Sequence, residues 1–201
     1  MSFFLSKDPS IYRTIAAGLA ALTPPVHVIW KLGPSELSGA DPASVLGFNT
    51  PGLPTHIHLT PWVPQNALLQ TGRVAAFLTH GGLNSVYEAA YHGVPLAGVP
   101  FFGDAADNIA KAVSRRMGLS LGKPADLTPG RVAGGLAALL ADPAYRAAAA
   151  DVSHRLRWRP GGPARSVAAD AVQRATQDWW AVKAVEEEIE MMMGGPGWSA
   201  S

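Results

Sequence analysis

Short apolar runs alternate with amphipathic segments along most of the chain. Residues 10–22 place aliphatic side chains at helical spacing and stop before a Pro-Pro pair, which predicts a helix. The run VHVIW (residues 26–30) is rich in β-branched residues and the run HIHLTPW (residues 56–62) alternates in polarity, so each predicts a strand. A loop rich in Gly, Pro and Ser, residues 33–54, separates the two strands.

The alternation continues from residue 65 to residue 121. Helices are predicted over Gln65–Gln70, Leu83–His92 and residues 105–117, and strands over residues 74–80, 95–100 and 119–121. Short strands that alternate with helices are typical of an α/β fold in which a doubly wound parallel sheet carries helices on both faces. We therefore expect a Rossmann-like α/β domain.

The last third of the chain predicts further helices. Two Ala-rich helices are expected after residue 128, the first with Thr128 as its N-cap and Pro129 in its first turn. One long helix is predicted from residue 164 onward, and the Gly-rich C-terminal end is expected to be disordered. We therefore expect one domain over residues 1–175 and a C-terminal helix with a disordered tail over residues 176–201.

Composition narrows the class of protein. A chain of 201 residues with 48% hydrophobic content suits one globular domain with a sizeable core. The formal net charge of +1 gives no electrostatic reason to expect nucleic acid or an anionic membrane as the main partner. The absence of cysteine excludes disulfides and Cys-ligated metals, and no DxD-like or His-rich set of ligands predicts a metal site.

The sequence predicts the cytosol as the compartment. The start MSFFLSKDPS has only a few apolar residues before Lys7 and Asp8, so it is too short and too early charged for a secretory signal peptide. No run approaches the ~18 to 20 apolar residues that a membrane helix needs.

Candidate chemistry begins in the segment FLTHGGLNSVYEAA, which predicts a strand, a tight turn and a helix. Gly81 and Gly82 allow a close backbone approach, and the first turn of the helix offers unpaired N–H groups to a phosphate. His80, Asn84 and Ser85 would add hydrogen-bond donors. The alternative is an ordinary turn in which Asn84 or Ser85 only caps the helix.

Four more residues of this region are candidates for a ligand site. Glu88 lies about one turn beyond Asn84 and Ser85 and could accept hydrogen bonds from a ribose, or simply face water. Trp62 closes a strand between two prolines, where its indole could stack on a base or join the core. Gln65 could reach the edge of that base or begin a helix, and Asp104 could hold sugar hydroxyls or cap a helix.

The spacing of these residues resembles the donor-binding signature of family 1 UDP-dependent glycosyltransferases. The motifs PWVPQ, FLTHGGLNSVYEA, GVPLAGVP, FGDAADNIA and MGLSL carry the resemblance, which extends over roughly residues 3–122. It implies the C-terminal, nucleotide-sugar-binding half of a GT-B fold, over residues 1–175. A UDP-sugar would be the co-substrate, with no further cofactor.

The resemblance also implies a role for each candidate residue. Trp62 would stack on the uracil and Gln65 would lie beside the nucleoside. The diphosphate would be held by His80, Asn84, Ser85 and the amides of Gly81 and Gly82. Glu88 would take the ribose hydroxyls and Asp104 would contact the sugar.

The chain departs from the family pattern in two ways: in residues near the sugar-binding end of the signature, and in its length. Ala105 stands where the family usually has Gln, and Leu83 where plant members carry Trp. Family members are about twice as long, and their N-terminal half supplies the acceptor site and the His that acts as general base. No His of this chain has a positional claim to that role.

The resemblance implies the inverting transfer of a hexose from a UDP-sugar to a hydroxyl of a hydrophobic small-molecule acceptor. Whether this chain is itself an enzyme stays open, and no catalytic residue is predicted. The alternatives are a non-catalytic nucleotide-binding module and a half-enzyme that needs a separate acceptor-binding chain.

Overall fold

The structure is a computed structural model that describes residues 9–32, 45–47, 54–159 and 162–163. The chain divides into two compact units, Met1–His154 and Arg155–Ser201. The boundary predicted after residue 175 lies outside the described residues, as do the long helix and disordered end predicted from residue 164 and most of the loop predicted over residues 33–54.

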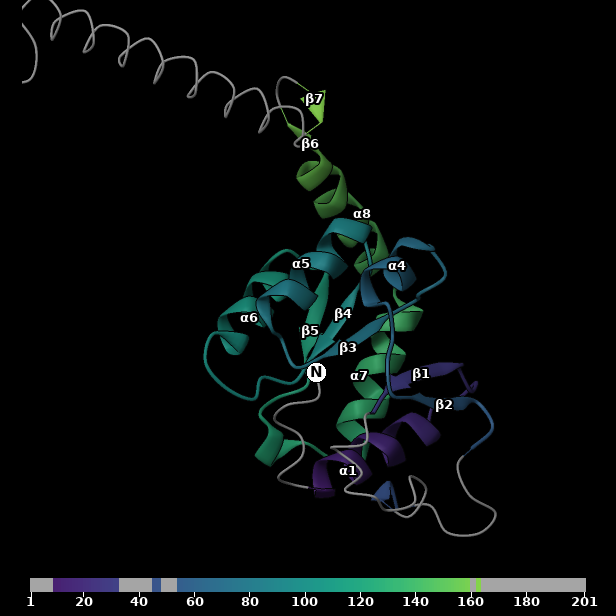
Figure 1. Ribbon diagram of the computed structural model, residues 1–201. Helices are drawn as coiled ribbons and strands as arrows, with labels where there is room; N and C mark the ends of the chain where they lie inside the picture. The colour runs from purple at the N-terminus through teal and green to yellow at the C-terminus, as the bar shows by residue number, and fades with distance from the viewer. Residues whose placement is uncertain (1–8, 33–44, 48–53, 160–161, 164–201) are drawn as a thin grey trace, which may run out of the picture. The chain divides into compact units, whose positions relative to one another are not determined.

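The described elements alternate as the sequence predicted (Figure 1). The order is α1 (Pro9–Ala20), β1 (Val28–Lys31), β2 (Ile57–Thr60), α4 (Gln65–Gln70), β3 (Phe77–Thr79), α5 (Leu83–His92), β4 (Leu96–Gly98), α6 (Ala105–Ser114), β5 (Gly118–Ser120), a 3-10 turn η2 (Pro124–Asp126), α7 (Pro129–Ala141), α8 (Pro143–Arg157), β6 (Trp158–Arg159) and β7 (Gly162–Pro163).

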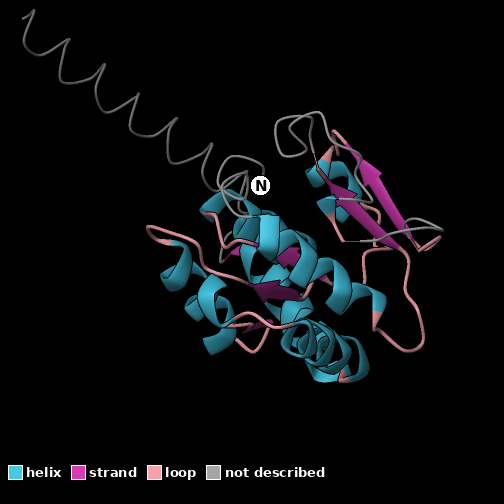
Figure 2. Cartoon of the chain, turned by 90° about the horizontal axis from the view of Figure 1, so that it is seen from below, coloured by secondary structure: helices cyan, strands magenta, loops and turns pink. Residues whose placement is uncertain are grey.

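The strands of the first unit are all parallel, and they form two sheets. β1 pairs with β2, and β3, β4 and β5 pair side by side in that order. Figure 2 shows the two groups of strands apart from each other. The prediction of an α/β fold with parallel strands is confirmed, while the described strands divide between two sheets. In the second unit, β6 and β7 form an antiparallel pair.

Helices cover both faces of the three-stranded sheet. Successive residues of a strand point to opposite faces. In β4, Ala97 packs in a core with residues of α1 and α7, whereas a Cβ on the next residue, Gly98, would lie 2.5 Å from Cδ1 of Ile109 in α6. α6 and α7 therefore lie on opposite faces, which is the doubly wound arrangement.

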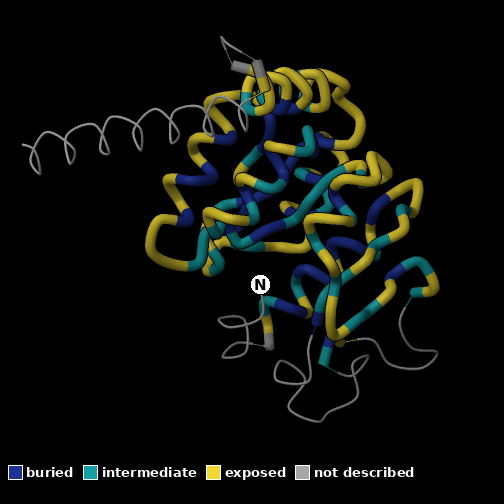
Figure 3. The backbone as a smooth tube through the Cα atoms, turned by 45° about the horizontal axis from the view of Figure 1, so that its top comes forward, coloured by how far each residue is buried: buried dark blue, intermediate teal, exposed yellow. Residues whose placement is uncertain are grey.

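One core joins the two sheets. Its buried members come from α1, β2, α7 and the segments around β4 and β5: Ile15, Leu19, Leu22, Ile57, Ala97, Val99, Leu121, Val132, Leu136 and Leu139. Figure 3 shows buried and exposed stretches alternating along the chain. β4 is buried at all three residues, whereas every residue of β1 is half-buried or exposed.

Most element ends lie where local chemistry predicts. Thr128 caps α7, because its Oγ1 accepts a hydrogen bond from Arg131 N at 3.2 Å and Pro129 follows it. α6 ends at Ser114, three residues before the predicted end, since Arg116 takes a φ of +56° and turns the chain back so that Met117 is buried. β3 begins at Phe77 instead of residue 74.

Among the described residues, no helix combines the length and the apolar character needed to cross a membrane.

Candidate donor-binding site

The centre of the candidate site is the turn between β3 and α5. Gly82 is the N-cap of α5 and makes no side-chain capping hydrogen bond. Asn84 and Ser85 lie inside the first turn of the helix, so the alternative in which one of them is the N-cap is wrong. The first N–H groups of α5 are therefore not covered by a capping side chain. They lie at the N-terminal end of the helix, where the partial positive charge attracts anions.

The two glycines of this turn are held by close packing. Gly81 is buried and has a φ of +88°, and a Cβ there would lie 2.8 Å from the Ala105 carbonyl oxygen. A Cβ at Gly82 would lie 2.6 Å from Nε2 of His80. The turn therefore needs glycine at position 81, where φ is positive and the α6 backbone is close, whereas a side chain at position 82 would displace the His80 ring.

His80 is half-buried beside the turn, and one nitrogen of its ring makes no hydrogen bond. Its ring stacks on Phe102 with the centroids 6.1 Å apart, and its buried Nδ1 has no hydrogen-bond partner. Burial lowers the pKa of His80 below its ordinary value of 6.5, and the nearby carboxylate of Asp104 opposes this shift. The ring is thus neutral at pH 7 in the free protein.

The depressed pKa of His80 predicts a loss of stability in acid. Because the folded-state pKa lies below the unfolded value of 6.5, the contribution of His80 to the free energy of unfolding is fully present above pH 6.5. This contribution is lost as the pH falls through the folded-state pKa. Urea unfolding measures the free energy of unfolding at pH 5 and at pH 8. The difference between the two values is expected to be smaller in His80→Gln than in wild type. The matched control is His154→Gln, because His154 is exposed. An equal effect of both variants would contradict the prediction.

Two hydrogen bonds from Gln65 join α4 to α5. The Nε2 group of Gln65 donates to Oε2 of Glu88 at 2.7 Å and to Oγ of Ser85 at 3.3 Å. Ser85 and Glu88 therefore share one face of α5, as the sequence predicted. All three side chains are half-buried, so the Glu88 carboxylate is held beside Gln65 of α4 and is only partly open to water.

Two more hydrogen bonds lie at the start of α6. Asp104 is the N-cap of this helix but makes no side-chain capping hydrogen bond. Its Oδ2 instead accepts a hydrogen bond from Nδ2 of Asn108 at 2.9 Å, and the same Nδ2 donates to the Gly81 carbonyl at 3.1 Å. Ala105, the residue that departs from the family pattern, is 1% exposed, so its methyl group belongs to the interior.

Trp62 follows β2 and is 72% exposed, which excludes the alternative of a core tryptophan. Its backbone carbonyl accepts a hydrogen bond from Thr60 Oγ1 at 2.9 Å, and the ammonium group of Lys31 lies 5.9 Å from the ring centroid. A large exposed indole beside a strand end is a ready stacking surface for a planar ring.

The structure thus connects most of the predicted residues in two groups. Gln65, Ser85 and Glu88 form one, and His80, Gly81, Gly82 and Asp104 form the other. Asn84 is exposed at the start of α5, and Trp62 follows the end of β2, three residues before Gln65. Sequence reasoning noted Asn108 four residues after Asp104 but gave it no role in the site, and it missed Phe102.

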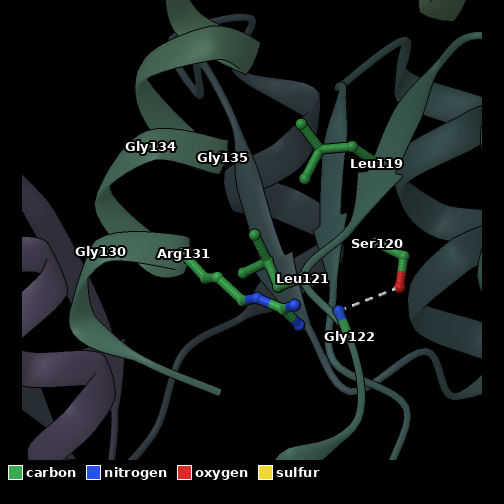
Figure 4. Close-up of a pocket in the computed structure, with 8 residues that line it drawn as sticks. All are labelled: Leu119, Ser120, Leu121, Gly122, Gly130, Arg131, Gly134 and Gly135. Carbon is green, nitrogen blue, oxygen red and sulfur yellow. Dashed lines mark hydrogen bonds between the residues drawn. The ribbon is translucent and has the colours of Figure 1, made fainter. Parts of the chain in front are cut away.

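A cavity of about 530 Å³ lies elsewhere, between the end of β5 and the start of α7 (Figure 4). It is lined mainly by Leu119, Leu121 and four glycines, and Arg131 is its one charged lining residue. In Figure 4, Gly122 N donates to Ser120 Oγ at 3.3 Å. None of the predicted site residues lines this cavity, so it is not the candidate donor site.

Comparison with known sequences identifies a family. The sequence model described as UDP-glucoronosyl and UDP-glucosyl transferase matches residues 6–166. The chain is 38% identical over 160 residues to 2-hydroxyacylsphingosine 1-beta-galactosyltransferase of Rattus norvegicus, covering 80% of this chain and 26% of that protein. It is 48% identical over 109 residues to UDP-glucuronosyltransferase 2A3 of Pongo abelii, covering 54% of this chain and 18% of that protein. The chain therefore spans about a quarter, or less, of the length of these relatives.

A solved structure has the same fold. The calicheamicin glycosyltransferase CalG4 superimposes with a TM-score of 0.63 and 30% sequence identity. The match covers 86% of this chain and 41% of that protein.

Proposed function

Because the chain belongs to the UDP-glucoronosyl and UDP-glucosyl transferase family, we propose that its described part binds the UDP-sugar donor of a hexosyl transfer. The observation that carries the proposal is the turn at residues 80–82, which leads into a helix without a side-chain cap and is hydrogen-bonded to Asn108, the partner of Asp104. Helix N-termini of this kind attract phosphate groups.

The contacts support assigning different residues to the different parts of the UDP-sugar. The diphosphate is placed at the amides of Gly82 and the first turn of α5, beside His80. Glu88 and Ser85, which Gln65 holds on one face of α5, are placed at the ribose. Asp104 is placed at the sugar, and Trp62 at the uracil.

The chemical role of these groups is to stabilise the leaving UDP. When an acceptor hydroxyl attacks C1 of the sugar, the bond from C1 to the diphosphate oxygen breaks and negative charge collects on that diphosphate. Amides at the start of α5 and the His80 ring lie where they stabilise this charge, so we propose that the reaction needs no metal ion. The acceptor and the general base that takes its proton are proposed to come from outside the described residues. The predicted cytosolic location stays a prediction.

Calorimetric titration of the chain with UDP, UDP-glucose and UDP-glucuronate tests the proposal. Saturable binding of UDP and tighter binding of one UDP-sugar are expected. Equal affinity for UDP and every UDP-sugar would favour the alternative of a non-catalytic nucleotide module. No binding of any of them by folded protein would overturn the proposal.

Loss of the indole at residue 62 is expected to weaken UDP binding roughly tenfold, because stacking on an aromatic ring contributes about 1–3 kcal/mol per base. Trp62→Ala and wild type are compared by titration with UDP and with inorganic pyrophosphate, which has no base to stack. The matched control is Trp158→Ala, since Trp158 is 55% exposed but belongs to the other unit. A Trp62→Ala protein that binds UDP as wild type does would rule out the stacking role.

A further inference from the structure

Asn108 is a buried polar residue whose two hydrogen bonds both reach the candidate site. The residue is 2% exposed and lies in the second turn of α6. Its side-chain NH₂ group has two N–H donors. Both acceptors, the Gly81 carbonyl at 3.1 Å and Asp104 Oδ2 at 2.9 Å, belong to the groups placed around the donor.

The bond to Gly81 fixes the direction of an amide at the proposed diphosphate position. The carbonyl of Gly81 and the N–H of Gly82 belong to one trans peptide group and point in opposite directions. Because Asn108 in α6 binds the carbonyl, the N–H of Gly82 is directed the opposite way, away from Asn108. At a glycine with a φ of +88°, where the backbone has unusual freedom, this bond restrains a peptide that could otherwise rotate.

The bond to Asp104 restrains the carboxylate placed at the sugar. Asp104 is exposed, and its side chain does not cap α6, so the helix itself does not fix its rotamer. Asn108 holds Oδ2 and leaves the other oxygen, Oδ1, to accept a hydrogen bond from a sugar hydroxyl. A carboxylate held in this way loses less conformational freedom when the sugar binds.

We propose that Asn108 is a positioning residue that couples the diphosphate turn to the sugar-binding carboxylate and so raises the affinity for a UDP-sugar above that for UDP. The inference rests on the proposed function. This inference goes beyond the proposed function, because it assigns the discrimination between UDP and a UDP-sugar to a buried side chain, Asn108, that touches neither ligand.

A double-mutant cycle tests the coupling. The dissociation constants for UDP and UDP-glucose are measured by calorimetry for wild type, Asp104→Ala, Asn108→Ala and the double variant, and their ratio is the gain from the sugar. Asp104→Ala is expected to lose most of this gain without weakening UDP binding by more than about twofold. Asn108→Ala is expected to weaken UDP binding by about tenfold, because the Gly81 carbonyl loses the bond that restrains the turn, and to lose the same sugar gain, because Asp104 loses the bond that holds its carboxylate. The double variant is expected to lose no more sugar gain than either single variant.

Two further variants separate positioning from folding. Ser153→Ala is the matched control, because Ser153 is 8% exposed and also donates to a backbone carbonyl, that of Tyr91 at 2.6 Å, in a different part of the same unit. It is expected to lower stability without changing the ratio. If Asn108→Ala fails to fold, Asn108→Ser, which keeps one donor in place of two, takes its place and is expected to lose part of the sugar gain.

The outcomes distinguish the two proposals. Wild-type protein that binds neither UDP nor UDP-glucose would overturn the proposed function and this inference with it. Wild type that prefers UDP-glucose, together with a folded Asn108 variant that keeps the wild-type ratio, would overturn the positioning role alone. A wild type that shows no sugar gain would also overturn it, while leaving nucleotide binding intact.

Discussion

Substitution of Gly81 by alanine is expected to abolish detectable UDP binding and to lower the free energy of unfolding by roughly 2 to 5 kcal/mol. Two costs add at this position. A residue with a Cβ is strained at a φ of +88°, and the new methyl group would lie 2.6 Å from Cδ1 of Ile109 and 2.8 Å from the Ala105 carbonyl oxygen. The Ile109 side chain can shift, but the carbonyl is part of the α6 backbone, so the turn itself must move away from α6.

The displaced turn would take the proposed phosphate-binding amides with it. We therefore expect a loss of UDP affinity of at least about a hundredfold, since several N–H groups change direction together. Calorimetry with UDP and urea unfolding measure the two effects.

Gly72→Ala is the matched control for the Gly81 variant. Gly72 has a φ of +71°, but a Cβ there would meet nothing within 4 Å, so the variant carries the backbone strain without the clash. It is expected to lower the free energy of unfolding by about 1 kcal/mol and to bind UDP normally. Equal destabilisation by the two substitutions would show that the contact with α6 does not constrain the turn.

Removal of the Glu88 carboxylate has the second largest expected effect, a loss of UDP affinity of about 10- to 100-fold, with a loss of stability of about 1 kcal/mol because the half-buried Gln65 amide loses one acceptor. A hydrogen bond to a charged group contributes about 1.5–3 kcal/mol. In the free protein Oε2 of Glu88 accepts from Gln65 at 2.7 Å, so the carboxylate is already oriented on the face of α5 that carries Ser85. Glu88→Ala would remove the acceptor and leave the Gln65 amide without it.

The nucleotide 2′-deoxy-UDP makes this test specific to the ribose. Wild type is expected to bind UDP more tightly than 2′-deoxy-UDP, and Glu88→Ala is expected to bind the two alike. Asp126→Ala is the control, since it removes one exposed carboxylate distant in the sequence from α5. If Glu88→Ala keeps the preference for the ribose form, Glu88 does not contact the ribose hydroxyl.

The local elements of the site follow from the sequence because their causes are local. α5 spans Leu83–His92 and α4 spans Gln65–Gln70 as predicted, since apolar spacing and flanking Gly or Pro residues mark their ends. The Thr128 cap of α7 was predictable for the same reason, because the residues that make it are three apart.

The long-range contacts of the site could not be predicted in this way. The bond from Gln65 to Glu88 joins residues 23 apart, and the bond from Asn108 to Gly81 joins residues 27 apart. Both depend on how helices dock against neighbouring elements, which periodicity does not encode. The division of the parallel strands into two sheets is likewise decided by tertiary packing, because the residue pattern of a single strand does not specify which strands lie beside it.

The two separate sheets bear on how the protein avoids aggregation. Within the described part of the chain, β1 and β2 pair only with each other, and β3 and β5 pair only with β4, so each of these four strands has one open edge. Open edges of backbone N–H and C=O groups are templates for pairing with other molecules. Here β1 and β2 have four residues each, β3 and β5 have three each, and β1 ends in Lys31. Edges so short offer an incoming strand few ladder hydrogen bonds, and the cation at the end of β1 disfavours pairing there, so the open edges of both sheets are poor templates for aggregation.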